Sequence, residues 1–418
     1  MPIEITLNEN QIKDLLEKYG SPLQIYDGNL IKKNLINFLK IMTNKNKNFK
    51  QYFAVKALPN PNILKLLVDN GAFLDCSSLN ELKLAEIIGV TGEKIMFTSN
   101  YTSKEDLKYA KNLNAIINLD DISLIEDLNS IGMPNILSFR LNPGIGKTDS
   151  ETLSNILGGP NAKFGISEDQ IINAYKKAKE YGVNRFGLHI MTGSNVMDIN
   201  YWKEIIKIVY YYINKIQKEV LIRLEFINIG GGIGIPYKPE VKPINIQELA
   251  DIISETIEEE KNKYDLDNID LYMENGRFIT GPYGWLLSKC NVIKNSYAKY
   301  YGLDACMSNL MRPGMYEAYH HICVLGKSTL DDNGIETEEV NVVGTLCENN
   351  DWFAKKRILP ISNINDIFII YDTGAHSHSM GFQYNAKLRA PEILILNDDY
   401  KLIRRKEVFD DYISTVLF

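Results

Sequence analysis

A lysine closes the otherwise apolar run formed by residues 52–57. With the two-residue period of a strand, Lys56 shares one face with Tyr52 and Ala54. Burial of an ammonium group is costly and lowers the pKa of the amine, which then attacks an aldehyde more readily to form a Schiff base. The run therefore predicts an amine site for a carbonyl compound at Lys56. An ion pair between Lys56 and a neighbouring carboxylate such as Asp75 is the alternative.

A glycine run follows the apolar residues 225–229 and consists of Gly230, Gly231, Gly232 and, after one residue, Gly234. Glycine lets the backbone approach a ligand closely and direct its N–H groups at an anion. The run does not have the GxGxxG spacing that opens a dinucleotide-binding helix. It indicates a phosphate site, with Ser194 as a further donor after another apolar run, and a simple tight turn is the alternative.

An acidic and a basic residue flank the turn formed by residues 274–277. Arg277 could bind a phosphate in bidentate fashion, and Glu274 could bind the nitrogen of a heterocycle. A plain ion pair between Glu274 and Arg277 is the alternative.

The elements that must position these residues alternate between β-rich runs and amphipathic helical stretches from about residue 50 to 275. Eight strand–helix units over roughly 250 residues are typical of a (β/α)₈ barrel, in which functional residues lie at the C-terminal ends of the strands. The expected strands are residues 52–57, 72–75, 94–97, 115–119, 136–141, 186–191, 225–229 and 270–274.

The rest of the chain has a different period. Beyond about residue 281, short runs at 340–343, 367–371 and 401–404 alternate with turns, as in a β domain. We therefore expect an α/β fold in which a TIM-like (β/α)₈ barrel, residues 26–280, precedes a C-terminal mainly-β domain, residues 281–418. Residues 1–25 hold a helix that ends at Gly20, and the sequence leaves open which domain this segment packs against.

The composition excludes several classes of protein. The 418 residues carry a net charge of -7, which disfavours nucleic acid and anionic membranes as partners. No apolar run approaches the about 18 residues of a membrane span, and the first ten residues lack a leader pattern, so we expect a cytoplasmic protein. The five cysteines lack CxxC spacing, which argues against disulfides and against a metal site.

Several groups of residues, taken in order, resemble the motifs of the alanine-racemase-like, fold type III pyridoxal-phosphate decarboxylases. These groups are Phe53-Ala54-Val55-Lys56-Ala57, Gly187-Leu188-His189, Gly193-Ser194, Gly230-Gly231-Gly232 and Glu274-Asn275-Gly276-Arg277. The second half of the chain is similar to the diaminopimelate decarboxylase branch, at residues 311–320, at Gly344-Thr345-Leu346-Cys347-Glu348 and at Tyr384-Asn385. The resemblance covers nearly the whole chain.

This resemblance implies a role for each matching residue. Pyridoxal 5'-phosphate would be the cofactor, and Lys56 would carry it. The remaining cofactor site would consist of Asp75, Met191, Ser194, Gly230, Gly231, Gly232, Glu274, Gly276, Arg277 and Tyr384. The substrate site would consist of Arg277, Arg312, Tyr316, Glu348 and Tyr384. Cys347 would be the proton donor, and in this family Cys347 and Glu348 reach the active site of the other subunit, which implies a homodimer with shared active sites.

The sequence departs from the family pattern at three places. Met191 replaces the histidine that stacks on the cofactor ring, Asn275 replaces a proline, and Asn349-Asn350 replaces Ser-Gly before Asp351. A thioether can still cover an aromatic face. These departures indicate a divergent branch.

The resemblance predicts decarboxylation of meso-2,6-diaminopimelate to L-lysine and CO₂, a step of lysine biosynthesis. The first alternative is a decarboxylase of another basic amino acid, such as D-ornithine or D-lysine. A racemase is less favoured because the C-terminal part carries the Arg312 and Cys347 motifs. A regulatory homologue without cofactor is disfavoured by the presence of Lys56, Glu274 and Cys347.

Overall fold

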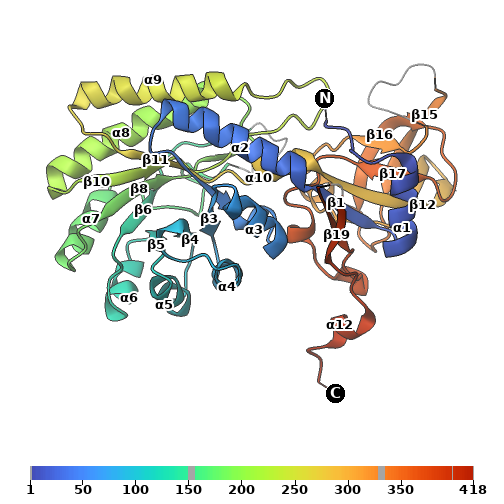
Figure 1. Cartoon of the computed structure of the whole chain (residues 1–418), viewed down its shortest axis with the longest axis horizontal. Coiled ribbons are helices and arrows are strands. Elements are labelled where there is room, and N and C mark those ends of the chain that lie inside the picture. Colours follow the sequence, from blue (N-terminus) through green and yellow to red (C-terminus); the bar gives the residue numbers. More distant parts are fainter. Residues whose placement is uncertain (1, 149–155, 328–334, 398, 418) are drawn as a thin grey trace. The chain divides into compact units, whose positions relative to one another are not determined.

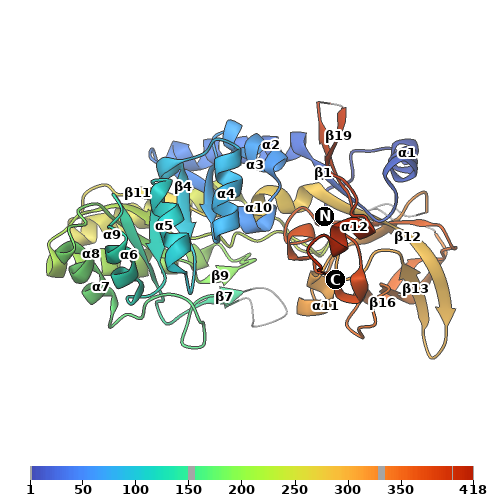
Figure 2. The same ribbon diagram turned by 90° about the horizontal axis from the view of Figure 1, so that it is seen from below.

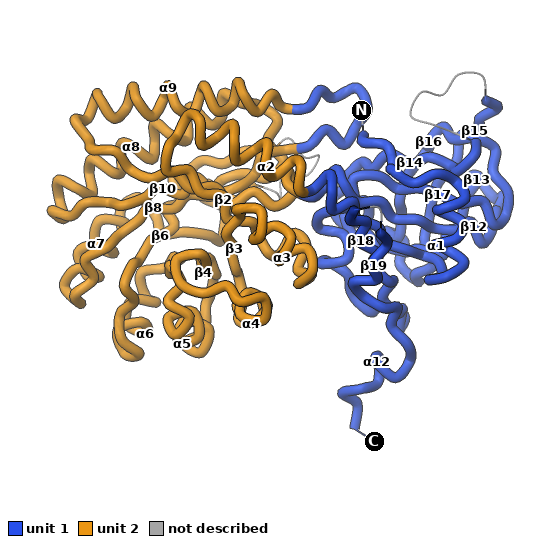
Figure 3. The backbone as a smooth tube through the Cα atoms, in the orientation of Figure 1, with its two compact units in different colours: residues 1–31, 235–243, 280–418 blue, residues 32–234, 244–279 orange. Residues whose placement is uncertain are grey.

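Figure 1 shows the computed structural model, which describes residues 2–148, 156–327, 335–397 and 399–417. The chain forms two compact units (Figure 3). Unit 1 comprises Met1–Ile31, Ile235–Pro243 and Thr280–Phe418, and unit 2 comprises Lys32–Gly234 and Ile244–Ile279. Unit 1 is thus assembled from three separate stretches of the chain.

Eight parallel strands close into a barrel in unit 2, in the order β10-β11-β2-β3-β4-β5-β6-β8. Each strand overlaps one predicted run and differs from it by no more than 3 residues at either end, so the predicted (β/α)₈ barrel is confirmed. The strands are β2 (Lys50–Ala54), β3 (Phe73–Cys76), β4 (Ile95–Thr98), β5 (Ile116–Leu119), β6 (Leu137–Leu141), β8 (Phe186–Ile190), β10 (Leu224–Asn228) and β11 (Asp270–Met273).

Helices cover the outer face of the barrel, as Figures 1 and 2 both show. They are α2 (Gly28–Lys45), α3 (Pro61–Asp69), α4 (Leu79–Ile87), α5 (Lys104–Asn112), α6 (Leu124–Ser130), α7 (Ile171–Glu180), α8 (Asn200–Val220) and α9 (Ile246–Tyr264). Helices cover the outer face of the strands, and side chains fill the interior of the barrel. Most strand residues are therefore buried on both sides. Among the residues that the structure describes, no helix is long and apolar enough to cross a membrane.

Aromatic side chains fill part of the barrel interior. The rings of Phe226 and Tyr272 stack with centroids 4.6 Å apart, and Tyr52 lies 5.4 Å from Tyr272. Gly187 makes room for Phe226, because a Cβ at this position would lie 2.1 Å from the ring. The residues of this apolar cluster lie in the N-terminal and middle parts of the strands. The C-terminal ends of the strands carry polar residues, which can bind a ligand.

A mixed β-sheet forms the centre of unit 1 and confirms the predicted mainly-β domain. Its order is β16-β15-β13-β12-β1-β18-β19, with β17 paired to both β12 and β14. The strands are β1 (Leu23–Asp27), β12 (Gly284–Asn295), β13 (Lys299–Leu303), β14 (Ile322–Val324), β15 (Thr337–Val343), β16 (Trp352–Pro360), β17 (Ile367–Ile370), β18 (Glu392–Leu396) and β19 (Asp399–Arg404).

The N-terminal segment belongs to this β domain. Strand β1 pairs antiparallel with β12 and parallel with β18. Helix α1 (Glu9–Tyr19) begins with a capping box between Asn8 and Gln11 and ends at Gly20, whose φ of 86° suits a helix C-terminus. The buried face of α1 packs with Trp285 and other residues of the sheet. The N-terminal segment, whose packing partner the sequence leaves open, is therefore part of unit 1.

Candidate active site

Lys56 follows the first barrel strand but is not part of it. Strand β2 ends at Ala54, and Lys56 lies in the 3₁₀ turn η1 (Val55–Ala57). Its side chain is exposed, so the expectation of a buried amine is wrong for this structure. The physical reason is that the chain leaves the extended conformation after Ala54, where the alternation of strand faces no longer applies.

The charge of Lys56 nevertheless acts on three carboxyl groups. Burial raises the pKa of Asp75 and of Glu81, and the charge of Lys56 opposes this rise without cancelling it. The same charge is one of the causes that lower the pKa of Glu274. Since these effects require proximity, the Lys56 amine lies near the ends of β3 and β11, where Asp75 and Glu274 stand, and near Glu81 in α4.

Glu274 follows β11 and is buried, with 6% of its surface exposed. The His189 Nε2 atom lies 3.0 Å from one carboxylate oxygen, and Asn228 Nδ2 donates to the other at 2.6 Å. Thr98 Oγ1 also donates to Glu274, at 3.3 Å. A carboxylate only accepts, so His189 must carry its proton on Nε2. Side chains from three other strands, β4, β8 and β10, thus hold this carboxylate in place.

Glu274 and Asp75 are two buried acids whose pKa values shift in opposite directions. Burial favours the neutral form of Glu274, but His189, Lys56 and Arg140 outweigh it and lower the pKa below its ordinary value. Burial and the neighbouring Glu274 raise the pKa of Asp75 well above its ordinary value. Of the two acids, Glu274 is therefore the one whose ionised form the site favours, and Asp75 is the one whose neutral form it favours.

The predicted phosphate loop lies against the ends of β8 and β11. Gly230 and Gly232 have φ values of 72° and 98°, which side chains rarely adopt. A Cβ on Gly231 would lie 2.3 Å from the carbonyl oxygen of Glu274, and one on Gly276 would lie 2.7 Å from Ala57 Cβ. Larger residues would force this loop away from the strand ends.

Two side chains meet beside this loop. Ser194 lies in the short strand β9 (Gly193–Ser194), which pairs with β7 (Lys147–Thr148), and Arg277 opens the short helix α10 (Arg277–Thr280). Arg277 Nη2 donates to Ser194 Oγ at 3.3 Å. A guanidinium, a hydroxyl and a glycine loop together are suited to a phosphate dianion.

Met191 contacts the glycine loop directly. The backbone N–H of Gly231 lies 3.2 Å from Met191 Sδ. The thioether therefore stands at the same strand ends as Glu274.

Sequence reasoning missed polar residues that support this cluster. Arg140, near the end of β6, lies 3.7 Å from Asp120 and donates to the carbonyl oxygen of Met191 at 3.1 Å. Asn228, the last residue of β10, holds Glu274 and also accepts a hydrogen bond from the Gly230 N–H at 2.9 Å. A polar side chain at the end of an apolar strand was the available signal in both cases.

Arg312 and Tyr316 lie in unit 1, on the short helix α11 (Arg312–Tyr316). Arg312 is buried, with 4% of its surface exposed, and Tyr316 is partly buried. Proline at the second helical position is compatible with a helix start, because its missing N–H is not needed there.

Cys347, Glu348 and Tyr384 form an exposed group in unit 1. Asn385 Oδ1 accepts the Cys347 backbone N–H at 2.7 Å, and Tyr384 Oη donates to the Cys347 carbonyl oxygen at 3.5 Å. The other four cysteines are buried. The loop that carries Cys347 is thus tied to Tyr384-Asn385 while its thiol stays accessible.

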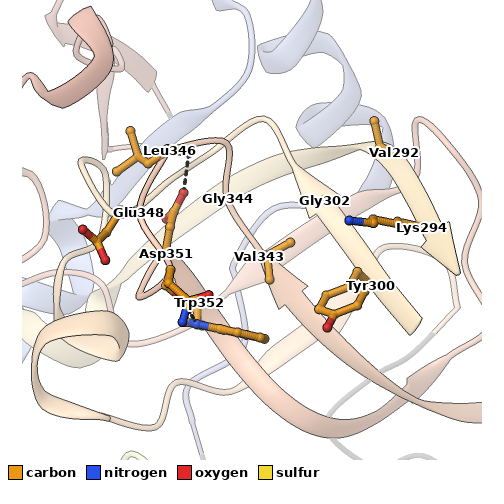
Figure 4. Close-up of a pocket in the computed structure, with 11 residues that line it drawn as sticks. Val292, Lys294, Tyr300, Gly302, Val343, Gly344, Leu346, Glu348, Asp351 and Trp352 are labelled. Atoms are coloured by element: carbon orange, nitrogen blue, oxygen red, sulfur yellow. Dashed lines mark hydrogen bonds between the residues drawn. The ribbon is translucent and has the colours of Figure 1, made fainter. Parts of the chain in front are cut away.

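The surface next to this loop is concave. A recess of about 430 Å³ lies here, and Figure 4 shows residues that line it, among them Glu348, Tyr300, Trp352 and Lys294. Asp351 supports the loop by accepting the Leu346 N–H at 2.7 Å, the bond drawn in the figure. Of the predicted site residues, Glu348 is the one that lines this recess.

The structure therefore brings the predicted residues together in two groups. Unit 2 gathers Lys56, Asp75, Met191, Ser194, Gly230, Gly231, Gly232, Glu274, Gly276 and Arg277. Unit 1 contains Arg312, Tyr316, Cys347, Glu348 and Tyr384.

The unit 2 group fits pyridoxal phosphate chemically. It combines a primary amine for the aldehyde, an ionised buried carboxylate for the ring nitrogen, and donors for the phosphate. Asp75 Oδ1 and His189 Nδ1 are buried without a hydrogen-bond partner in the described part of the chain. Such atoms indicate a place where a bound group or water completes the site.

Comparisons with known proteins agree with this arrangement. Residues 29–281 match the family model "Pyridoxal-dependent decarboxylase, pyridoxal binding domain". The chain is 39% identical to Protein TabA of Pseudomonas amygdali pv. tabaci, covering 97% of this chain and 93% of that protein. It is 32% identical to diaminopimelate decarboxylase of Methanothermobacter thermautotrophicus, covering 95% and 92%.

A solved structure is similar over the same length. The crystal structure of diaminopimelate decarboxylase from M. jannaschii in complex with L-lysine gives a TM-score of 0.89 at 32% identity, covering 98% of this chain and 94% of the other. With the family match over residues 29–281, the comparison shows that the chain belongs to the pyridoxal-dependent decarboxylases and uses pyridoxal phosphate as its cofactor.

Proposed function

We propose that the protein decarboxylates meso-2,6-diaminopimelate to L-lysine and CO₂. The observation that carries this proposal is the 32% identity, over nearly the full length of both chains, to a diaminopimelate decarboxylase whose structure holds L-lysine. The buried guanidinium of Arg312 supports it, because diaminopimelate has a second carboxylate that a planar cation can bind in bidentate fashion.

The residues of unit 2 divide the work of binding the cofactor. Lys56 would carry it through its amine, and Ser194, Arg277 and the loop 230–232 would bind its phosphate. When bound, pyridoxal phosphate supplies a sink for the electron pair that CO₂ leaves behind. Ionised Glu274, which His189 and Asn228 fix in place, would accept a hydrogen bond from the ring N–H and keep that proton on the nitrogen.

The residues of unit 1 bind the substrate and donate a proton to it. Arg312 and Tyr316 bind the carboxylate at the far end of diaminopimelate. Cys347 Sγ returns a proton to the α-carbon after CO₂ has left, and Glu348 binds the substrate beside it. Exposure of the thiol supports this role, because a proton donor must reach the reacting carbon.

We further propose a homodimer in which Cys347, Glu348 and Tyr384 of each subunit complete the site of the other. The exposure of this group and the recess beside Glu348 support it, since a concave surface can receive a partner. We also propose a cytoplasmic location, where L-lysine enters protein synthesis.

The deciding experiment compares kcat/KM for meso-diaminopimelate, D-lysine and D-ornithine with the purified protein. We expect meso-diaminopimelate to be preferred. Arg312→Ala should lower kcat/KM for it by roughly 30-fold to several thousand-fold, because breaking a buried charged pair costs about 2–5 kcal/mol. Arg312→Lys should rescue only part of the loss. The variants must retain cofactor and oligomeric state.

A decarboxylase of another basic amino acid is the second candidate. The 39% identity to TabA, whose name specifies no substrate, is the reason to test it. Preference of the wild type for D-lysine or D-ornithine would replace the first proposal by this one.

A further inference from the structure

The Arg312 guanidinium is held between an aromatic ring and an imidazole. Its central carbon lies 4.2 Å from the centre of the Tyr237 ring, and Nη1 lies 2.7 Å from His320 Nε2. His320 has no exposed surface, and Tyr237 has 7%. All three residues belong to unit 1, so this cluster forms within one compact body.

The hydrogen bonds of His320 fix its protonation. His320 Nδ1 lies 2.7 Å from the carbonyl oxygen of Tyr371. A carbonyl oxygen only accepts, so Nδ1 must carry a proton, and a guanidinium only donates, so Nε2 must be the bare acceptor. The neutral Nδ1–H tautomer is the one form of His320 that satisfies both neighbours.

Tyr237 fixes the plane of the guanidinium. The residue comes from the segment Ile235–Pro243, which leaves the barrel sequence after the glycine run and packs in unit 1. Its ring also contacts His320, with centroids 5.0 Å apart at an angle of 64°. A cation over a ring face and an edge-to-face pair both restrict orientation, so Arg312 has little freedom to turn.

A buried acid nearby does not neutralise Arg312. Burial raises the pKa of Asp372 to about 8, although Arg312 acts to lower it. Asp372 is therefore mainly protonated at neutral pH, where it adds little negative charge beside the Arg312 guanidinium.

We propose that His320, as its Nδ1–H tautomer, is a positioning residue that together with Tyr237 presents Arg312 to the far carboxylate of a dicarboxylate substrate. The inference rests on the proposed function, because it assigns that carboxylate to Arg312. It adds that selectivity for a dicarboxylate depends on two residues that need not touch the substrate.

Two amide substitutions separate the two hydrogen bonds of His320. In His320→Gln the amide oxygen can replace Nε2 and accept from Arg312. In His320→Asn the shorter amide can replace Nδ1 and donate to Tyr371, but it does not reach Arg312. We expect His320→Asn to raise KM for meso-diaminopimelate about 10- to 100-fold with little change in kcat, and His320→Gln to change KM several-fold less.

A monocarboxylate substrate provides the contrast. For D-lysine, which lacks the far carboxylate, kcat/KM should change less than about 3-fold in His320→Asn. Equal losses for both substrates, or a fall in kcat alone, would show that His320 merely supports the fold and would overturn the proposal.

A spectroscopic test does not depend on turnover. In protein labelled with ¹⁵N-histidine, the His320 signals, assigned by their loss in His320→Gln, should show a protonated Nδ1 and an unprotonated Nε2 at neutral pH. The opposite tautomer or a doubly protonated ring would overturn the proposal. A wild type that prefers D-lysine would instead refute the proposed function, and the dicarboxylate role of Arg312 with it, even if the tautomer were as assigned.

Discussion

The two groups of predicted site residues differ in how completely one chain satisfies them. At the barrel strand ends, Glu274 is buried and bound by His189, Asn228 and Thr98. In the β domain, the loop with Cys347 is anchored through its backbone, but its thiol is exposed. A cofactor site can thus be organised within one unit, whereas the proposed proton donor, Cys347, is exposed on the surface. The proposed shared active site requires this difference.

Removing a residue from each group tests this comparison and gives the largest effect. Lys56→Ala should abolish turnover and the visible absorbance of bound cofactor without unfolding the barrel, because the exposed side chain contributes little packing. Cys347→Ala should also be inactive. Mixing the two inactive proteins should restore about a quarter of wild-type activity, because half of randomly formed dimers contain one intact site of two.

Subunit exchange must be shown independently in the mixing experiment, for example with tagged subunits. No recovery after demonstrated exchange would mean that each site is built from one chain. Full activity of Lys56→Ala alone would refute its role as the cofactor lysine.

A comparison within the barrel group gives the next largest effect. Glu274→Gln removes a negative charge that the site keeps ionised, so kcat should fall about 10²- to 10³-fold. Asp75→Asn replaces an acid whose neutral form is favoured, because burial and Glu274 raise its pKa. Its effect on kcat should be at least about 10-fold smaller than that of Glu274→Gln. Steady-state kinetics of cofactor-loaded variants measure both, and equal losses would contradict the different roles given to the two acids.

The sequence was sufficient to predict those elements whose pattern of apolar and polar residues is periodic along the chain. Alternation of apolar runs and amphipathic stretches located all eight barrel strands, and strand ends located Glu274 and the glycine loop. The exposure of Lys56 was not predictable, because periodicity does not tell where a strand turns into a 3₁₀ helix. Nor was the place of β1, since its pairing with β12 and β18 joins residues far apart along the chain and has no local signal.

The same limit applies to the cluster around Arg312. Arg312 belongs to a recognisable motif, but Tyr237 precedes it by dozens of residues and lies in a segment that the sequence assigned to the barrel. Contacts of this kind follow from tertiary packing and become visible only in the folded chain.

Two glycines, one in each unit, sharpen the comparison further. Ala at Gly231 would place a Cβ 2.3 Å from a backbone oxygen, whereas at Gly302 in β13 the nearest atom would lie 3.4 Å away. We expect Gly231→Ala to lower the free energy of unfolding by about 1–3 kcal/mol and to weaken cofactor retention on dialysis. Gly302→Ala should leave cofactor retention unchanged. Equal retention in the two variants would contradict the tight approach of the glycine loop to β11.

The last expected effect is confined to stability and concerns the buried acid of the β domain, Asp372. Its pKa is about 8 in the folded protein, and that of an unfolded aspartate is about 3.9. The folded state therefore binds the proton more tightly, so the stabilisation from this group is complete below about pH 4 and is lost as the pH rises to about 8.

Asp372→Asn keeps the shape of the side chain but removes its titration, and asparagine tolerates the left-handed φ of 57° at this position. The variant should gain stability relative to wild type by up to about 1.4 kcal/mol per pH unit between pH 5 and 8. Urea unfolding midpoints at several pH values measure this, with the exposed Asp14→Asn as the control that should show no such trend. Parallel pH profiles for Asp372→Asn and wild type would mean that Asp372 is ionised, and that Arg312 is neutralised from within its own domain before any substrate arrives.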